Sequence, residues 1–395
     1  MCAGGAGNVK KHFTFQMNCQ MNHTTTNHFH STFLANWPKA NNSYPFIIAG
    51  PCSAESKEQV LATAHALKKI PQIKGFRAGV WKPRTRPNSF EGMGEEALPW
   101  LACVKKETGL FTAVEVANPR HVELCLKHGI DCLWIGARTT AGPFAVQEIA
   151  EALKGTDVVV MVKNPINAEL SLWIGALERL TASGLTKLVA IHRGFAGAEN
   201  NIFRNLPVWE VPLELKRHFP DLPIICDPSH IAGRRDLIER VSQMALDMDF
   251  DGLIVETHIT PDLALSDAAQ QITPSTLEEM LTRLEARLPS CHDHSYEESL
   301  EKERARIDRL DSELIEILLA RMKVVHHIAD IKAKHNVTAL QINRMDRLMK
   351  NRTEYAQKIG LDPTYIERIF QIVHAESVRV QSEWMAKVKN EVLKP

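Results

Sequence analysis

Eight short apolar runs alternate with helix-like stretches between Pro45 and Leu288. The runs are PFIIAG, GFRAG, FTAVEV, CLWIGA, VVVMVK, KLVAIHRG, PIICDPSH and GLIVETH, and each has the length and composition of a buried strand. Between them, segments such as SKEQVLATAHALKKI, EEALPWLACVKKETG and PRHVELCLKHG carry apolar residues at helical spacing, with glycine near their ends. Eight strand–helix units in about 230 residues predict a (β/α)8 barrel, an α/β fold.

The chain changes character after Leu288. The stretch PSCHDHSYEESLEKE has no apolar period and is typical of a linker. Beyond it the pattern predicts a helix of about 33 residues, ERARIDRLDSELIEILLARMKVVHHIADIKAKH, and then two shorter helices, the second after the start signal Asp362-Pro363. Three helices of unequal length bury the apolar side of the long one poorly, so we expect a homodimer through this domain, with a larger assembly left open.

These patterns divide the chain into four parts. We expect a tail at residues 1–40, a barrel at 41–288, a linker at 289–299 and an all-α three-helix domain at 300–390. The tail is polar and rich in Asn, Thr and His, which favours disorder or a misassigned start, with Met17 or Met21 as the alternative start.

Composition excludes several classes of partner. Lysine plus arginine and aspartate plus glutamate both number 47, and no basic stripe is interleaved with aromatic residues, so we expect no nucleic-acid partner. No apolar run approaches the roughly 20 residues that span a bilayer, so we expect no membrane contact. The eight cysteines form no CxxC pair and the N-terminus lacks the order of a signal peptide. We expect a reduced, cytoplasmic protein.

Positively charged residues lie at or just after the ends of the predicted strands. A lone cation there is usually a solvated loop residue, but these outnumber the nearby carboxylates, and buried charges need partners. Active sites of (β/α)8 barrels gather at this end of the strands. Phosphate and carboxylate groups of a ligand would balance the set, which consists of Arg77, Lys82, Arg84, Arg138, Lys163 and Arg193.

A second set of strand-end residues has metal-ligand chemistry. Cys52, His230, Glu256 and Asp267 supply one thiolate, one imidazole and two carboxylates. Such mixed donors suit one divalent ion such as manganese, iron, cobalt or zinc, and we expect no organic cofactor. Taken alone, Cys52 is equally well explained as a small buried residue.

The barrel segment resembles 3-deoxy-D-arabino-heptulosonate 7-phosphate (DAHP) synthase in its short type I form. IIAGPCS, FRAGVWKPRT, WIGARTT, VKNP, DPSH, VETH and ALSD carry this resemblance over about residues 45–288. It implies phosphoenolpyruvate and erythrose 4-phosphate as substrates, with Cys52, His230, Glu256 and Asp267 as the metal ligands. It also implies that phosphoenolpyruvate meets Arg77, Lys82, Arg138, Lys163 and Arg193, and that erythrose 4-phosphate meets Lys82, Arg84 and Thr85. Lys82 is expected to transfer the proton, and His230 is the other residue expected in the catalytic set.

Two other barrel enzymes fit these motifs less well. The related synthase for 3-deoxy-octulosonate 8-phosphate has a Lys-Ala-Asn-Arg type motif, so the sequence Lys82-Pro83-Arg84-Thr85 disfavours it. A metal-dependent barrel hydrolase is disfavoured because no HxH pair follows the first strand. One departure from the DAHP synthase pattern is His192 before Arg193, where the family commonly has Glu.

Residues of about 300–390 resemble the all-helical chorismate mutase, from ARIDRLDSELIEILLAR to LDPTYIERIFQIVHAESVRVQ. Arg321 and Lys332 lie 11 positions apart, about three helical turns, and so face the same way. The resemblance implies chorismate as substrate and prephenate as product. It further implies that Arg304 (from a partner chain), Arg321, Arg344 and Ser377 hold the two carboxylates, with the catalytic Lys332 and Gln381 on the ether oxygen.

Two positions depart from the mutase pattern and leave an alternative open. Gln341 and Met345 stand where the family usually has Asp and Glu on the substrate hydroxyl. Mutase activity could therefore be modest or depend on the rest of the protein. In the alternative, the helical domain dimerises, senses chorismate or prephenate and inhibits the synthase without catalysis, which would be feedback regulation.

Overall fold

The computed structural model describes residues 45–82, 90–197, 202–288, 291 and 293–392. The predicted tail and the site residues Arg84 and Thr85 lie outside this part of the chain. The chain forms two compact units, Met1–Pro289 and Ser290–Pro395, and each is described by itself.

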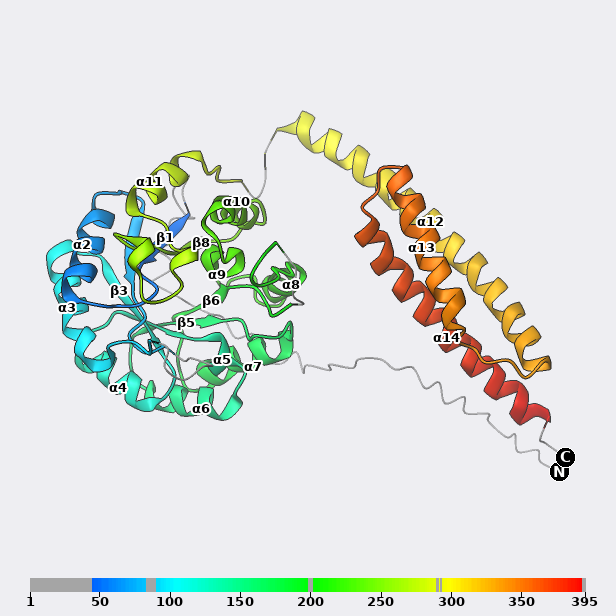
Figure 1. The fold of residues 1–395 in the computed structure, drawn as a ribbon, viewed down its shortest axis with the longest axis horizontal. Coiled ribbons are helices and arrows are strands. Elements are labelled where there is room, and N and C mark those ends of the chain that lie inside the picture. The colour runs from blue at the N-terminus through cyan, green and yellow to red at the C-terminus, as the bar shows by residue number, and fades with distance from the viewer. Residues whose placement is uncertain (1–44, 83–89, 198–201, 289–290, 292, 393–395) are drawn as a thin grey trace, which may run out of the picture. The chain divides into compact units, whose positions relative to one another are not determined.

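The first unit is a closed barrel of eight parallel strands, which confirms the predicted fold (Figure 1). Each strand pairs with the next along the chain, and β1 closes the ring on β8. The strands are β1 Phe46–Gly50, β2 Ile73–Arg77, β3 Phe111–Val116, β4 Cys132–Ile135, β5 Val159–Lys163, β6 Leu188–His192, β7 Ile224–Cys226 and β8 Gly252–Glu256. Seven of the eight apolar runs identified in the sequence contain a whole strand, and the run GFRAG overlaps β2, which begins two residues earlier at Ile73.

Helices surround the strands in Figure 1. Side-chain caps begin several of them, as Ser56 does for α2, Asn118 for α4 and Thr273 for α11, because a cap satisfies a free backbone N–H of the first turn. The helices are α2 Lys57–Lys68, α3 Leu98–Thr108, α4 Pro119–Lys127, α5 Ala137–Thr140, α6 Pro143–Ala152, α7 Leu170–Ala182, α8 Glu210–His218, α9 Pro228–Ala232, α10 Ile238–Asp247 and α11 Pro274–Arg283.

Two layers of apolar side chains hold the barrel together. Alternate strand residues, among them Ile48, Trp134, Met161 and Ile254, fill the inside of the ring. Their neighbours along the strands pack outward against the helices. Because both faces are buried, the strands read as continuous apolar runs, and a charge at a strand end stands out against them.

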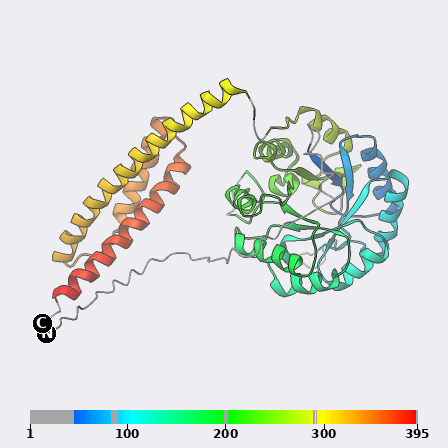
Figure 2. The ribbon, with the colours of Figure 1, turned by 180° about the vertical axis from the view of Figure 1, so that it is seen from behind.

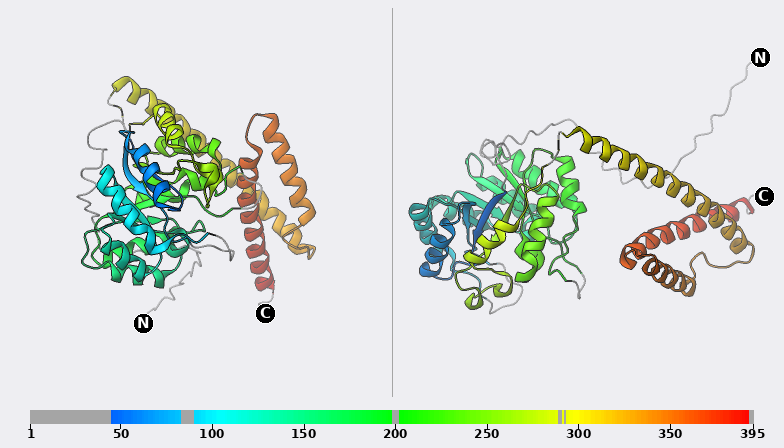
Figure 3. Two further views of the ribbon diagram at one scale, coloured as in Figure 1. Left: turned by 60° about the vertical axis from the view of Figure 1, so that its left-hand side comes forward. Right: turned by 90° about the horizontal axis from the view of Figure 1, so that it is seen from above.

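The second unit contains three helices, α12 His294–Lys334, α13 Ile342–Lys358 and α14 Pro363–Val392. Helix α14 packs on both others, and Figures 2 and 3 follow the three from further directions. Helix α12 is longer than predicted and takes in the end of the expected linker. Asp293 accepts hydrogen bonds from the backbone of Ser295 and Tyr296, and this cap begins the helix although no apolar period marks the segment.

Helix α12 exposes a long set of apolar side chains. Each of the following is more than half exposed in the single chain: Ile307, Leu310, Leu314, Ile315, Ile317, Leu319, Val324 and Ile331. Within the described residues, no helix has the length and apolar content that crossing a bilayer requires.

Candidate functional site

The carboxyl ends of the eight strands meet at one end of the barrel and carry buried charge there. Arg77 ends β2, Lys163 ends β5 and Glu256 ends β8, and they expose 1%, 4% and 0% of their surface. Burying an unpaired charge costs several kcal/mol, so such groups are tolerated only with partners. The structure pairs Arg77 Nη2 with Glu256 Oε1 at 3.2 Å and Lys163 Nζ with Asp227 Oδ2 at 3.0 Å.

The guanidinium of Arg77 is only partly satisfied by these contacts. Among the residues that the structure describes, its Nε and Nη1 have no hydrogen-bond partner. A buried unsatisfied N–H costs about 1–3 kcal/mol. Nε–H and the N–H groups of Nη1 point to different sides of the planar guanidinium, so oxygens of an anionic ligand that accept from them would relieve this cost.

Three of the four predicted metal ligands have donor atoms that lie together. The donor atoms of Cys52, Glu256 and Asp267 are all within 4.8 Å of one another. Cys52 Sγ donates to Asp267 Oδ2 at 3.3 Å. His230, the fourth, directs Nε2 toward Glu256 Oε1 at 3.8 Å. Sulfur, carboxylate oxygen and imidazole nitrogen at such separations fit a borderline divalent ion.

The protonation state of Cys52 bears on whether it can act as a metal ligand. Burial, with Glu256 adding to it, raises the pKa of the Cys52 thiol to about 12. A thiolate here therefore needs a compensating positive charge, which a divalent ion supplies. Asp267 has φ +46°, a left-handed conformation that is uncommon for a residue other than glycine and is often found at functional sites.

His230 is held by a carboxylate on its other side. Asp227, at the start of α9, accepts from the backbone N and from Nδ1 of His230 at 3.1 and 3.0 Å. Burial lowers the pKa of His230, so its ring is neutral at pH 7 and Nε2 is free to act as a ligand. Burial opposes ionisation of Asp227, but the neighbouring His230 and Lys163 lower the pKa of Asp227 well below its ordinary value. Asp227 thus positions a predicted ligand and a predicted substrate-binding cation.

Lys82 lies against the same cluster. Its Nζ donates to Cys52 Sγ at 2.9 Å and to the Cys52 carbonyl at 3.1 Å. Burial opposes the charged form, but Cys52 and Glu256 outweigh it and raise the pKa of Lys82. Lys82 is therefore an ammonium group at neutral pH, next to the candidate ligands.

Arg193 and Arg138 form a second positive region. Burial lowers the pKa of Arg193 to about 10 against the opposing effect of Asp227, and the charges of Arg204 and Arg138 add to the lowering. Arg193 Nη1 donates to Asn205 Oδ1 at 2.8 Å, whereas Arg138 is exposed on α5. Several cations this close together favour binding of an anion.

Several positioning residues were not identified from the sequence. Asn164 Oδ1 accepts from the backbone N of Arg193 at 2.7 Å, and Asn205 Nδ2 donates to the carbonyl of His230 at 2.6 Å. Arg204 Nη1 donates to Asp267 Oδ1 at 3.2 Å. For Asp227 the motif DPSH was a signal, because the carboxylate three positions before His230 also caps a helix.

His192, which departs from the family pattern, faces away from this cluster. Its ring packs among Phe195, Trp209 and Phe250, with centroids 5.7, 5.0 and 6.0 Å away. Among the described residues, none forms a hydrogen bond with the ring nitrogens of His192. The backbone of Pro207 is close enough to influence the pKa of His192. Arg193 is held through hydrogen bonds with Asn164 and Asn205 and does not depend on the His192 side chain.

The helical unit brings four of its six predicted site residues to its inner side. Arg321 Nη1 donates to Ser377 Oγ at 2.5 Å, Gln381 Nε2 donates to the Ser377 carbonyl at 3.0 Å, and Lys332 Nζ donates to the Ala339 carbonyl at 2.6 Å. Ser377 and Gln381 are buried, and Oε1 of Gln381 has no partner in the described part of the chain. Burial lowers the pKa of both Arg321 and Lys332.

The remaining two predicted mutase residues lie on the surface of the single chain. Arg344 is exposed on α13, and Arg304 is exposed on α12, where Nη1 lies 3.8 Å from Glu301 Oε2. Two members of the predicted carboxylate-binding set are therefore exposed in the single chain.

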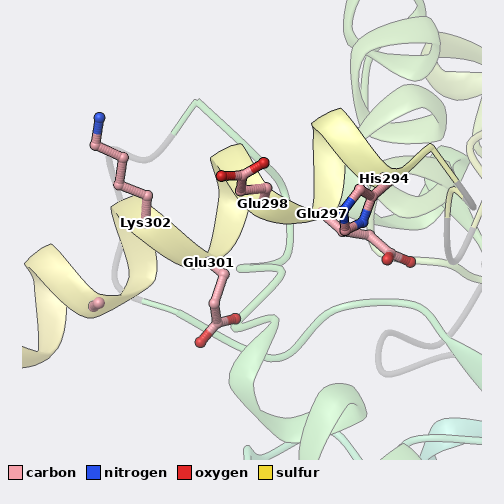
Figure 4. Close-up of a pocket in the computed structure, with 6 residues that line it drawn as sticks. His294, Glu297, Glu298, Glu301 and Lys302 are labelled. Carbon is pink, nitrogen blue, oxygen red and sulfur yellow. The ribbon is translucent and has the colours of Figure 1, made fainter.

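A hollow of about 560 Å³ lies along the first turns of α12. Figure 4 shows its side chains, His294, Glu297, Glu298, Glu301 and Lys302, spread along the helix surface. All of them are exposed and none belongs to the predicted sites, so the hollow is a feature of the helix surface.

Comparison with protein families gives one match in each compact unit. A family model described as DAHP synthetase I family matches residues 35–288. A second, described as chorismate mutase type II, matches residues 303–382.

Known proteins similar to the chain match its barrel. The phospho-2-dehydro-3-deoxyheptonate aldolase of Thermotoga maritima is 32% identical over 246 residues, covering 62% of this chain and 70% of that protein. A 2-dehydro-3-deoxyphosphooctonate aldolase of Desulfotalea psychrophila is 27% identical over 272 residues, covering 60% and 88%. The crystal structure of the Thermotoga maritima DAHP synthase has a TM-score of 0.55 at 30% identity and covers 62% of this chain and 68% of its own. Its truncated form has a TM-score of 0.53 at 28% identity, covering 61% and 85%.

Proposed function

Because the chain belongs to the DAHP synthetase I family and carries a chorismate mutase type II domain, we propose that it is a bifunctional enzyme of aromatic amino acid biosynthesis. The barrel condenses phosphoenolpyruvate with erythrose 4-phosphate to DAHP and phosphate. The helical domain rearranges chorismate to prephenate. The observation that carries the first assignment is the buried Arg77, whose Nε and Nη1 have no hydrogen-bond partner among the described residues, beside the donor cluster of Cys52, Glu256 and Asp267.

Cations at the strand ends bind the substrates. Arg77 donates from Nε and Nη1 to oxygens of phosphoenolpyruvate, and Lys163 and Arg193 supply further positive charge, with Lys82 and Arg138 completing the set. The proposed partners of erythrose 4-phosphate are Lys82, Arg84 and Thr85, the last two outside the described residues. The positive charges offset the repulsion between the two anionic substrates. Binding both side by side turns a bimolecular reaction into one between positioned groups.

Cys52, His230, Glu256 and Asp267 would hold one manganese, iron, cobalt or zinc ion. When bound, the ion acts as a Lewis acid on the aldehyde carbonyl. The methylene carbon of phosphoenolpyruvate bonds to the aldehyde carbon, the aldehyde oxygen takes a proton from the Lys82 ammonium, water adds to the former enol carbon, and phosphate leaves by C–O cleavage. Asp227 keeps Nε2 of His230 directed at the ligand cluster.

Substitution of Cys52 tests the ligand set. Cys52→Ala should abolish metal-dependent condensation, measured as phosphate release from the two substrates. Cys125→Ala is the matched control, because this buried cysteine lies on the outer helix α4. Full activity of Cys52→Ala in excess chelator would contradict the proposal.

The number of carbons in the aldehyde substrate has to be decided separately, because relatives of both the heptonate and the octonate kind match the barrel. The Lys-Pro-Arg-Thr sequence at 82–85 supports the four-carbon aldehyde, erythrose 4-phosphate. Parallel assays with erythrose 4-phosphate and arabinose 5-phosphate decide it. Preferred turnover of arabinose 5-phosphate would overturn the choice.

For the helical domain, the contacts of Arg321, Ser377 and Gln381 support a site for a dicarboxylate. A Claisen rearrangement needs no nucleophile, only a folded substrate and positive charge beside the breaking ether bond, which Lys332 and Gln381 would provide. Arg304 would come from a second copy of the chain, and Arg344 would close over the carboxylates. The exposed apolar residues of α12 support a homodimer, because pairing the helices would bury them.

The alternative is a non-catalytic chorismate or prephenate sensor that inhibits the barrel. Lys332→Ala separates the two, with Lys334→Ala, on the same helix, as the control. Loss of chorismate consumption in the first variant alone supports catalysis, whereas unchanged turnover excludes it. Titrating prephenate into the synthase assay then tests feedback.

The free state of the six described cysteines supports a reducing compartment, and we place the protein in the cytoplasm.

A further inference from the structure

Trp134 lies directly against the candidate substrate-binding cations and is not among the predicted site residues. It belongs to β4, is fully buried and is part of the layer of side chains that fills the barrel. Large side chains in that layer are ordinarily packing residues. Three polar contacts distinguish this one.

Two cations approach its ring. Arg77 Cζ lies 4.9 Å and Lys163 Nζ 5.7 Å from the ring centroid. Both distances are within the roughly 6 Å at which an indole face attracts a cation, and the attraction is strongest in desolvated places such as this. The two cations come from β2 and β5, so the ring on β4 links charges from separate strands.

The indole is also tethered. Its Nε1 donates to Glu115 Oε2 at 2.8 Å, and Glu115 is the residue paired with Trp134 across β3 and β4. A carboxylate on the indole N–H fixes the ring plane and, by withdrawing the proton, enriches the ring in electron density.

An aromatic ring face and a carboxylate hold the Arg77 guanidinium in different ways. A carboxylate that accepted hydrogen bonds from Arg77 would occupy its N–H groups, whereas Glu256 forms an ion pair with Nη2 only. A ring leaves the in-plane donors of a guanidinium unoccupied, and Nε and Nη1 of Arg77 are without a partner among the described residues.

We propose that Trp134 is a positioning residue of the phosphoenolpyruvate site, where its indole, tethered by Glu115, orients Arg77 and Lys163 and leaves the Arg77 donors free for the substrate's oxygens. This inference rests on the proposed synthase function. Trp134 should therefore affect the affinity for phosphoenolpyruvate and leave the affinity for erythrose 4-phosphate unchanged.

The test compares an aromatic with a non-aromatic replacement in the full-length chain. Binding of phosphoenolpyruvate is measured by calorimetry, and KM for each substrate and kcat by phosphate release. Trp134→Met should raise the Kd for phosphoenolpyruvate about tenfold, equivalent to about 1.4 kcal/mol, whereas Trp134→Phe, which keeps an aromatic ring, should raise it less than about threefold. KM for erythrose 4-phosphate should change less than about twofold in both.

A matched control removes an equally buried tryptophan elsewhere in the barrel. Trp173 on α7 is fully buried and donates Nε1 to the Val162 carbonyl at 3.1 Å. Trp173→Met should leave the Kd unchanged. Equal Kd values for Trp134→Met and wild type, or equal effects of the Trp134 and Trp173 variants, would overturn the inference.

A second measurement decides the matter if Trp134→Met does not fold. Fluorinated tryptophans incorporated at position 134 by nonsense suppression keep the size of the ring and reduce its negative face. The Kd for phosphoenolpyruvate should rise with each added fluorine, and a constant Kd would overturn the inference. Failure of the wild-type chain to bind phosphoenolpyruvate would instead refute the proposed function, and the inference with it.

Discussion

Asp227→Asn is the most informative single change in the barrel. Asp227 is fully buried and serves Lys163 through Oδ2 and His230 through Oδ1. Asparagine keeps the shape and also caps a helix well, so the cap of α9 is retained and the change isolates the charge.

The expected loss of stability follows from the burial of Lys163. Its ion pair with Asp227 spans 3.0 Å and the lysine is 4% exposed. Removing one partner of a buried pair leaves the other charge uncompensated, which costs about 3–5 kcal/mol. The loss of the carboxylate behind His230 should in addition weaken binding of a divalent ion about 10–100-fold.

Urea denaturation of the barrel and calorimetric titration with Mn²⁺ measure the two effects. Asp236→Asn is the control, because its partner Arg234 and the carboxylate itself are both exposed, and neither quantity should change. A loss below about 1 kcal/mol in Asp227→Asn, or the same loss in both variants, would refute the reasoning from buried charge.

Three further predictions address other parts of the chain. Burial lowers the pKa of His192 to about 3, whereas the pKa in the unfolded chain is about 6.5. The free energy of unfolding is therefore unaffected by His192 above about pH 6.5, and it falls by about 2 kcal/mol by pH 5 because the unfolded chain binds a proton that the folded chain does not. His192→Phe, which suits the aromatic surroundings, should lose less stability between pH 7 and pH 5 in urea denaturation, and an identical pH dependence would contradict this. Replacing Gln341 by Asp and Met345 by Glu should raise kcat/KM for chorismate about tenfold by restoring hydrogen bonds to the substrate hydroxyl, and an unchanged value would count against this site. Chelation with EDTA should stop condensation by the barrel and leave chorismate consumption by the same sample unchanged, because only the first reaction uses a metal, and parallel loss would contradict two independent sites.

The sequence was sufficient for the architecture, and it identified the residues that the structure brings together as a candidate site. Strands buried on both faces read as continuous apolar runs, so eight of them alternating with helices predicted the barrel. A charged residue at the end of a strand, such as Arg77 or Glu256, indicated where the candidate site lies. The sequence did not predict the start of α12, because the cap at Asp293 makes a polar segment helical without an apolar period.

Which partner each charge takes was decided only by the tertiary structure. Arg77 and Lys163 meet the same indole although they are 86 positions apart, and Lys163 meets Asp227, 64 positions away. Such contacts arise when the barrel closes, and they cannot be predicted from the spacing of the residues along the chain. Residue type and place along a strand therefore determine which groups reach the mouth of the barrel. The closure of the barrel and the low dielectric inside it determine which of these groups pair with one another.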